Sequence, residues 1–526
     1  MQQKGNSMKN TEEKTRLLGM AGQRILSEYE RNGGEGFRQA LSYPVRLGPG
    51  YTLYPKSVFY SEGMYFCIAG IEGEKKLCIF SREEVSSAFP GERIKAGNLH
   101  GVLADRNWES YQSVHPYLPF IKPVSLRNKR TSLGCGDRLG LASPGHIRAC
   151  EGYDIHPVLA QQSIRELTLT DRTYKGVVSD AAFLTLQEGF TRGYGADGDH
   201  IKLMDDIKVA VAADMPMITL DLTEVMDPAP ADWGQEKIDQ EFERLNQDCR
   251  ERVLEDYAGK TFNLEKSSLH ISAEEAKRCA LIYWKAIDFT QEVDSYLRQE
   301  RGDAYDLEVS IDETTTPTIP SHHLFIAAEL QRRNVTVNSL APRFIGEFQK
   351  GIDYIGDLDT FEQQFVVHCE ISKVYGNYKM SIHSGSDKFS VYPIIGKLTD
   401  MRVHVKTAGT SWLEAVHTIS HVDTDLFRTM VAQAKNYIPE ALKLYHITAD
   451  FSKVPDPKEL SDSELYRFLE EIESRQMLHI CFGYLLFDPL IREKFFQTLA
   501  DHEEYHYETV KQHMLRHITL LGTPTV

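Results

Sequence analysis

The sequence predicts an α/β protein built on a TIM-like (β/α) barrel, with an N-terminal β-rich region and a helical C-terminal extension. Two observations predict this fold. Beyond about residue 130, short apolar runs alternate with amphipathic stretches of helical period, which is typical of βαβ units and a parallel sheet. The 526 residues, 41% of them hydrophobic, exceed one average domain and suit an elaborated barrel. We expect three parts, at residues 1–125, 126–420 and 421–526.

Residues 1–125 form the expected β-rich accessory region. The first 15 residues are polar and predict a loose tail. The apolar runs 58–60 and 64–68 flank a Ser-Glu-Gly turn, which indicates a β-hairpin, and 76–80 is a further strand-like run. The region holds no catalytic motif, which favours a cap or an oligomerisation domain.

The barrel region supplies seven expected strands, at 131–142, 194–201, 217–221, 306–312, 335–340, 379–383 and 402–406. Helices are expected at 156–168, 205–215, 273–298, 321–333, 361–375, 389–398 and 412–420, and a polar, partly helical insertion at 227–269. The helix at 273–298 follows Ser272 with Glu275 three residues on, a capping-box pattern. A closed barrel needs an eighth strand, for which 177–186 is the candidate. An open doubly wound sheet is the rival fold, but the sequence contains neither a G-x-G-x-x-G turn after the first strand nor a Walker A motif.

Residues 421–526 are expected to be mostly helical, with helical runs at 461–473 and 482–499.

The amino-acid composition limits which binding partners and which cellular compartment we expect for the protein. The net charge of −17 argues against nucleic acid and anionic membranes as main partners. No apolar run approaches the roughly 20 residues that span a bilayer, and the N-terminus has no signal-peptide pattern. The eight cysteines include no C-x-x-C pair and several lie in apolar runs, which predicts buried free thiols and a reducing compartment. We therefore expect a cytoplasmic protein, and a homo-oligomer is compatible with the sequence.

The alternation of apolar and polar residues along the expected strands predicts a polar site inside the barrel. Apolar residues on alternate positions should face the helices, so the residues between them face the interior. The inward-facing set is Glu308, Ser310 and Asp312; Lys379, Ser381 and His383; Arg402, His404 and Lys406; and Thr336 and Asn338. Charge inside a barrel is costly unless it is paired or holds a metal. The alternatives are buried ion pairs that close one barrel layer, or strands exposed on one face.

Two histidines, His200 and His383, fall near the ends of two such strands and are candidate metal ligands. A carboxylate would complete a site for Zn, Mn or Ni, and Glu347, Glu308 and Asp312 are the candidates. The alternative is that each histidine is an ordinary core or surface residue.

Four cations, Lys202, Arg343, Lys350 and Lys406, are candidates for binding an anionic substrate. A carboxylate favours arginine, whose planar fork binds it bidentately. The alternative for each of them is a solvated charge.

Residues 194–202, Tyr-Gly-Ala-Asp-Gly-Asp-His-Ile-Lys, resemble the signature of the tagaturonate epimerases. The other segments that carry the resemblance are 133–138, 310–314, 340–346, 350–354 and 381–388. The resemblance covers the chain from about residue 130 to the C-terminus, and the first 125 residues add no independent match.

The resemblance implies a metal-dependent interconversion of D-tagaturonate and D-fructuronate, small ketouronates, in hexuronate catabolism such as galacturonate degradation. It implies Asp199 as an acid/base group beside the metal ligand His200, with His383 as a later ligand. A second acid/base carboxylate is expected at Glu308, with Asp312 behind it, and the third metal ligand at Glu347. The expected substrate-binding residues are Lys202, Asp312, Arg343 and Lys406.

The two ketouronates differ at C4, which bears no acidic C–H because it lies β to the C2 ketone. Retro-aldol cleavage between C3 and C4, followed by bond formation on the other face, explains the inversion and needs a Lewis acid and two acid/base groups. The alternatives are an aldolase or isomerase of a related sugar acid on the same barrel, and a non-catalytic sugar-acid-binding protein.

Overall fold

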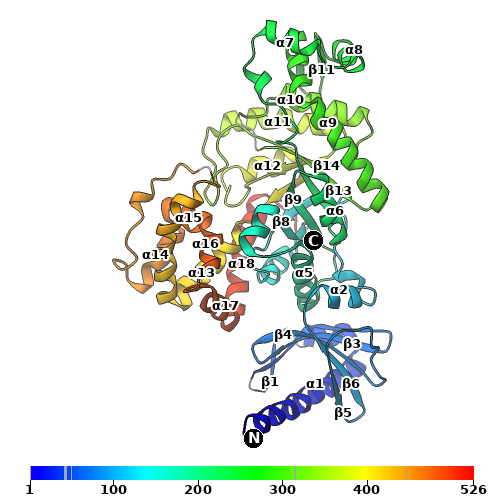
Figure 1. The fold of residues 1–526 in the computed structure, drawn as a ribbon, viewed down its shortest axis with the longest axis vertical. Coiled ribbons are helices and arrows are strands. Elements are labelled where there is room, and N and C mark those ends of the chain that lie inside the picture. The colour runs from blue at the N-terminus through cyan, green and yellow to red at the C-terminus, as the bar shows by residue number, and fades with distance from the viewer. Residues whose placement is uncertain (1, 41–43, 49, 313–315, 446) are drawn as a thin grey trace.

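The computed structural model describes residues 2–40, 44–48, 50–312, 316–445 and 447–526, with the backbone alone for 2–15, 17, 18, 39 and 40. Eight parallel strands close into a barrel in chain order, as the sequence predicts (Figure 1). They are β7 (Thr131–Gly134), β8 (His156–Ser163), β9 (Gly195–Ile201), β10 (Met217–Asp221), β13 (Asp306–Ile311), β14 (Val337–Pro342), β15 (Lys379–Ile382) and β16 (Val403–Lys406). The TIM-like barrel is confirmed, and the open-sheet alternative is wrong.

The eighth strand lies at β8, within the segment 156–168 that was expected to be helical, while 177–186 lies in helix α5 (Tyr174–Glu188). Both predictions were wrong for one reason. All eight residues of β8 are buried, so the strand lacks the alternation that marks a half-exposed strand. The helical signal belongs to α4 (Ile164–Thr170), which Ser163 and Glu166 open with a capping box.

Helices surround the barrel, and all but two of them lie where the sequence predicts a helix: 143–150 was not expected to be helical, and α5 covers 177–186, where a strand was expected. They are α3 (Ser143–Cys150), α5, α6 (Met204–Ala212), α9 (Ala273–Arg301), α10 (Pro320–Arg332), α11 (Leu358–Val374), α12 (Tyr392–Thr399) and α13 (Thr410–Val422). At the start of α9, the Ser272 side chain accepts from the Glu275 N–H, but the Glu275 carboxylate accepts from Ser321 Oγ instead of closing a capping box.

The insertion after β10 forms a separate lobe at the top of Figure 1. It contains η2 (Ala229–Asp232), α7 (Gln235–Phe242), α8 (Gln247–Asp256) and the hairpin β11 (Lys260–Asn263) and β12 (Ser268–Ile271). The expected polar, partly helical character is confirmed.

The N-terminal region is a six-stranded antiparallel sheet with a long helix on one face. The elements are α1 (Gln2–Ala40), β1 (Val45–Gly48), β2 (Tyr51–Ser61), β3 (Met64–Ile71), β4 (Glu74–Ser81), β5 (Glu92–Ala96) and β6 (Leu99–Ala104). The predicted hairpin is confirmed as β2–β3, but the expected loose tail is helical from Gln2, because it is rich in good helix formers such as Glu, Lys and Gln.

The two faces of this sheet are both buried. Tyr65 and Cys67 of β3 pack with Ile25 of α1, whereas Phe66 and Ile68 belong to the core shared with the barrel. The segment after β6, with α2 (Trp108–Val114) and η1 (Pro119–Ile121), leads into β7.

The C-terminal extension forms a second core around Trp412, Phe427, Phe468 and Phe495. It comprises α14 (Thr424–Ala441), η3 (Phe451–Lys453), η4 (Asp462–Leu469), α15 (Ile472–Ile480), α16 (Phe482–Phe487), α17 (Arg492–Asp501) and α18 (Glu503–Leu520). Helix α13 shares this core, so the extension packs from about residue 410 onward, and α18 returns to pack on α3 and α13. All eight cysteines are buried free thiols, and none of the described helices is long and apolar enough to cross a membrane.

Candidate functional site

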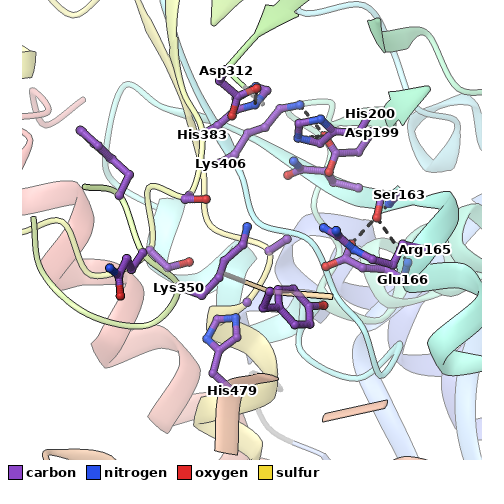
Figure 2. Close-up of a pocket in the computed structure, with 18 of the residues that line it drawn as sticks. Ser163, Arg165, Glu166, Asp199, His200, Asp312, Lys350, His383, Lys406 and His479 are labelled. Atoms are coloured by element: carbon purple, nitrogen blue, oxygen red, sulfur yellow. Dashed lines mark hydrogen bonds and ion pairs between the residues drawn. The ribbon is translucent and has the colours of Figure 1, made fainter. Parts of the chain in front are cut away.

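A cavity of about 280 Å³ lies at the C-terminal ends of the barrel strands (Figure 2). That is the end of a (β/α) barrel where active sites form. The barrel contributes Gln161, Ser163, Asp199, His200, Asp312, Arg343, Glu347, Lys350, His383 and Lys406 to its wall. The helical extension contributes Tyr445 and His479. The cavity is therefore polar and is built by two parts of the chain.

Lys406, at the end of β16, contacts three acidic residues from two strands, β9 and β13. Its Nζ lies 2.6 Å from Asp199 Oδ1, 2.9 Å from Glu308 Oε1 and 3.1 Å from Asp197 Oδ2. Burial alone would lower the pKa of Lys406, but these carboxylates outweigh it and raise the pKa well above its usual value. Lys406 was expected to bind the substrate anion; its ammonium is instead already paired.

Glu308 points into the barrel, as parity predicts, but it lies beneath the cavity wall. It accepts from Ser339 Oγ at 2.6 Å and from His383 Nε2 at 2.7 Å, and it is fully buried. Burial raises the pKa of Glu308, yet Lys406 and His383 together hold it well below its usual value. Glu308 is therefore a buried carboxylate that contacts Lys406 and His383, two residues that line the cavity.

Ser339 of β14 donates to Glu308 inside the barrel, so the predicted orientation of the side chains on this strand is wrong. Thr336 and Asn338 were expected to face the interior, whereas Thr336 Oγ1 accepts from Arg298 of the outer helix α9. The pairing of β13 with β14 shifts here, from Leu307↔Val337 to Glu308↔Ser339. An extra residue on one strand reverses its alternation, and a sequence pattern does not reveal it.

His200, His383 and Asp312 form one cluster, in which a ligand atom of each lies within 4.8 Å of the others. His383 Nδ1 is 3.1 Å from Asp312 Oδ1, and the two imidazole rings are 4.8 Å apart between centroids. His200 Nδ1 lies 3.4 Å from Asp221 Oδ2. The two predicted histidines thus meet, and the carboxylate beside them is Asp312, which was expected to bind substrate.

Carboxylates surround the two histidines of this cluster, among them Asp221, Glu308 and Asp199. Burial would lower the pKa of His383, but Asp312 and Glu308 outweigh it and raise the pKa to about 10. Burial likewise opposes the charge of Asp312, whose pKa His383 and His200 nevertheless hold well below its usual value. For Asp197, burial dominates and raises the pKa to about 6. Such a site attracts a cation.

The backbone at the end of β9 explains how Asp199 and His200, consecutive in the chain, both line the cavity. Consecutive strand residues normally point to opposite faces. Here His200 has a φ of 51°, in the left-handed region, and the pairing of β9 with β10 shifts between Ile218 and Leu220. A non-glycine residue in this conformation costs about 1 kcal/mol or more and is typical of functional sites.

The remaining predicted site residues, Arg343, Glu347 and Lys202, lie away from the cluster of His200, His383 and Asp312. Arg343 and Glu347, on the loop after β14, line the cavity and lie 3.9 Å apart between Nη2 and Oε1. Glu347 also pairs its backbone with Ile355 and does not join the cluster of His200, His383 and Asp312. Lys202 lies outside the wall, with its Nζ 3.6 Å from Asp221 and 3.5 Å from Glu224. Residues 313 and 314 of the segment 310–314 lie outside the described residues.

Several wall residues were missed by the sequence analysis: Gln161, Ser163, Arg165, Glu166, Tyr445 and His479. The first four were hidden because 156–168 was expected to be helical. The capping-box spacing of Ser163 and Glu166 was the available signal for a strand end at this place. Tyr445 and His479 carry no motif, and only the packing of the extension brings them to the cavity.

Three comparisons agree with this architecture. A sequence profile described as tagaturonate epimerase matches residues 54–521, so the match begins within the N-terminal sheet, where the sequence showed no resemblance. The tagaturonate/fructuronate epimerase of Thermotoga maritima is 38% identical over 475 residues, which cover 90% of this chain and 98% of the relative.

Solved structures of the fructuronate-tagaturonate epimerase UxaE from Cohnella laeviribosi are also similar. The native crystal structure superposes with a TM-score of 0.85 at 39% identity and covers 94% of this chain and 100% of that chain. A glycerol complex of the same protein gives a TM-score of 0.86 at 40% identity, over 90% of this chain and 96% of that chain.

Proposed function

The chain belongs to the tagaturonate epimerase family, and on that premise we propose that it interconverts D-tagaturonate and D-fructuronate by inverting C4. It is then an isomerase, an epimerase acting on a sugar acid. The observation that carries the proposal is the juxtaposition, in one cavity, of the His200–His383–Asp312 cluster with Asp199 and Lys406. The cluster has the ligands to bind a metal ion that acts as a Lewis acid, and Asp199 and Lys406 can transfer protons.

The donor set of the cluster fits a divalent metal. Two imidazoles and a carboxylate are ligands that Zn, Mn and Ni accept. Glu308 holds His383 through Nε2, which leaves Nδ1 for a metal, and this is the outer carboxylate that metal-binding histidines commonly have. We therefore assign His200, His383 and Asp312 as the ligands, with Glu347 as the alternative third ligand. A metal bound there would polarise the substrate ketone and stabilise negative charge on its oxygen.

Asp199 is the proposed base. Burial would raise its pKa, but Lys406, His200 and His383 outweigh it and hold the pKa well below the usual value, so Asp199 is deprotonated. It takes the proton of the C4 hydroxyl. The C3–C4 bond then breaks, its electrons remain with the ketone fragment as an enediolate, and C4 becomes an aldehyde. After the aldehyde turns its other face, the bond re-forms and the C4 oxygen regains a proton.

Glu308 was expected to be the second acid/base group. Because it lies beneath the wall, we assign it a positioning role through Lys406, whose ammonium lines the cavity and lies 2.9 Å from it. Lys406 donates a proton to the C4 alkoxide as the aldol bond forms. Asp199, whose Oδ1 lies 2.6 Å from Lys406 Nζ, then passes to the lysine the proton that it took from the C4 hydroxyl, which restores both groups. Glu308 and Asp197 stabilise the charged lysine.

Product analysis tests the function. Purified protein incubated with D-tagaturonate should form D-fructuronate, and Asp199→Asn should lower kcat by about 100-fold or more, as loss of a positioned base does. The matched control is Asp205→Asn, an exposed carboxylate on α6. Accumulation of three-carbon products would identify an aldolase, and ligand binding without turnover would identify a binding protein.

Solvent isotope incorporation tests the route. Retro-aldol chemistry leaves the C4 hydrogen in place, so a turnover in heavy water should leave the carbon skeleton unlabelled. One deuterium on carbon per turnover would contradict this route.

A further inference from the structure

The cavity has two chemically different ends (Figure 2). Asp312, His383, His200 and Asp199 lie at one end, and Lys350 and His479 lie at the other. The acidic cluster at the first end suits a cation and the reacting carbons. The second end holds polar side chains that the mechanism above does not use.

Lys350 is the cation at the second end. It lies on the loop after β14, lines the cavity, and its ammonium has no hydrogen bond or ion pair within the described parts of the chain. Burial lowers the pKa of Lys350, and Arg165 lowers it further. A partly buried ammonium without a partner is costly, and an anion in the cavity would remove that cost.

Two further polar side chains, His479 and Tyr445, line the same cavity and lack hydrogen-bond partners among the described residues. His479, from α15, is 1% exposed, and neither of its ring nitrogens has a hydrogen bond to a described residue. Burial holds the pKa of His479 well below its usual value, so the ring is neutral and offers one donor and one acceptor. The buried hydroxyl of Tyr445 likewise has no hydrogen-bond partner in the described part of the chain, while Arg165 lies over its ring at 5.1 Å.

The loop that carries Lys350 is fixed in place. Lys388 Nζ donates to the carbonyls of Gln349 at 2.8 Å and Ser386 at 3.0 Å. From α15, Gln476 Nε2 donates to the Lys350 carbonyl at 3.0 Å, and Arg475 Nε donates to the Gly351 carbonyl at 2.7 Å. The position of Lys350 is thus preorganised, which lowers the entropy cost of binding an anion.

Two other cations of the cavity wall, Lys406 and Arg138, already have anionic partners. Lys406 pairs with Asp199, Asp197 and Glu308. Arg138 pairs with Glu166 at 2.6 Å, and both are buried.

We propose that Lys350, His479 and Tyr445 form a carboxylate subsite that binds C6 of the substrate and so selects sugar acids over neutral sugars. This deepens the proposed function and rests on it. The Lys350 ammonium pairs with the carboxylate, and the His479 ring and Tyr445 hydroxyl donate to its oxygens or to the neighbouring C5 hydroxyl. The ketone then lies at the His200–His383–Asp312 end, and C4 lies between the two ends.

The subsite also has a consequence for the reaction. After cleavage of C3–C4, the aldehyde fragment consists of C4, C5 and C6 and keeps the carboxylate. Anchored at C6, this fragment remains in the cavity and presents its other face by rotation about C4–C5. The chain would thus retain the reactive fragment while its orientation changes.

Binding measurements on the full-length protein test the subsite. Calorimetry would give the dissociation constants of D-tagaturonate and of D-tagatose, in which a hydroxymethyl group replaces the carboxylate, for wild type and Lys350→Met. We expect Lys350→Met to weaken tagaturonate binding about 100-fold, as loss of a charge-assisted hydrogen bond does, and to change tagatose binding less than about threefold. Lys350→Arg should restore part of the tagaturonate affinity. The matched control is Lys208→Met, an exposed lysine on α6 that should change neither constant.

Two results would overturn the subsite: unchanged tagaturonate affinity in Lys350→Met, or an equal loss for both ligands, which would indicate a general structural defect. The test is separate from that of the function. A wild type that binds tagaturonate selectively without epimerising it would refute the proposed function alone. A wild type that epimerises tagaturonate while Lys350→Met keeps its selectivity would refute the subsite alone.

Discussion

Lys406 is the residue that connects the acidic strands of the barrel, since its ammonium contacts carboxylates from β9 and β13. Removal of this single positive charge leaves three buried carboxylates in mutual repulsion. The proton transfer that we propose for Lys406 therefore depends on the same ammonium that neutralises the interior carboxylates.

Replacing this lysine provides the prediction at the residue scale. Lys406→Met should lower the unfolding free energy by about 3 kcal/mol or more, because buried anions are left without their cation. It should also abolish epimerisation. Urea unfolding and a product assay measure the two effects. The exposed Lys208→Met should change neither, and a Lys406→Met protein of wild-type stability would contradict the ion network.

Much of this constellation can be predicted residue by residue. Alternation alone indicates that Glu308, His383 and Lys406 face the barrel interior, because the apolar residues between them need the helices. It does not indicate that Glu308 stops beneath the cavity wall, nor that Lys406 is already paired. Those properties depend on how neighbouring strands are staggered, which no single strand encodes.

The element that completes the site is helix α15 of the extension, which carries His479. Gly409, at the start of α13, allows its approach, because a Cβ at Gly409 would lie 2.2 Å from His479 Cε1. The extension therefore forms part of the cavity wall and does not merely pack on the outside of the barrel.

Gly409→Ala tests this contact at the scale of the element. The added methyl should displace the His479 ring and raise the KM for tagaturonate by about tenfold, the effect of losing roughly one hydrogen bond to a charged group. Initial-rate kinetics measure it. Gly234→Ala, where a Cβ would meet nothing within 4 Å, is the matched control. An unchanged KM in Gly409→Ala would argue against a role for His479 in binding.

Strand β8 shows where prediction of elements fails. Its residues are buried on both faces, so its pattern cannot be told from that of a buried helix, and the helix that follows directly adds its own signal. The hairpin β2–β3 is predicted well because its two apolar runs flank a Ser-Glu-Gly turn, and helix α9 is predicted well because an N-cap serine precedes a long stretch of helical period.

The whole molecule buries several neutral histidines, which makes its stability sensitive to acid. Burial lowers the pKa of His146, His368 and His506 to about 4, and that of His404 and His517 to about 3. The unfolded chain binds these protons near pH 6.5, whereas the folded chain does not until about pH 4. Their contribution to stability is thus fully present above pH 6.5 and is lost as the pH falls toward 4.

We therefore expect the unfolding free energy to fall by several kcal/mol between pH 7 and pH 5, since each such ring contributes about 1.4 kcal/mol per pH unit in this interval. Urea unfolding at each pH measures it. His146→Gln should lessen the slope, and replacement of the exposed His421 should not. A free energy that is constant or that increases on acidification would contradict the burial of neutral rings.

At this scale the sequence predicts the barrel and its three-part arrangement, because the alternation of strands and helices extends over hundreds of residues. It does not predict that the N-terminal sheet is buried on both faces or that α18 returns to the barrel. Such long-range packing depends on surfaces that come together only in the folded chain.

Catalysis, as we propose it, depends on a divalent metal held by His200, His383 and Asp312. The most direct measurement is the metal content of purified wild type, His200→Ala, His383→Ala, Asp312→Asn and Glu347→Gln. We expect about one equivalent in wild type and Glu347→Gln, and less than about a tenth of that in the other three, since loss of one of three ligands abolishes tight binding. Full metal content in both histidine variants would contradict the site.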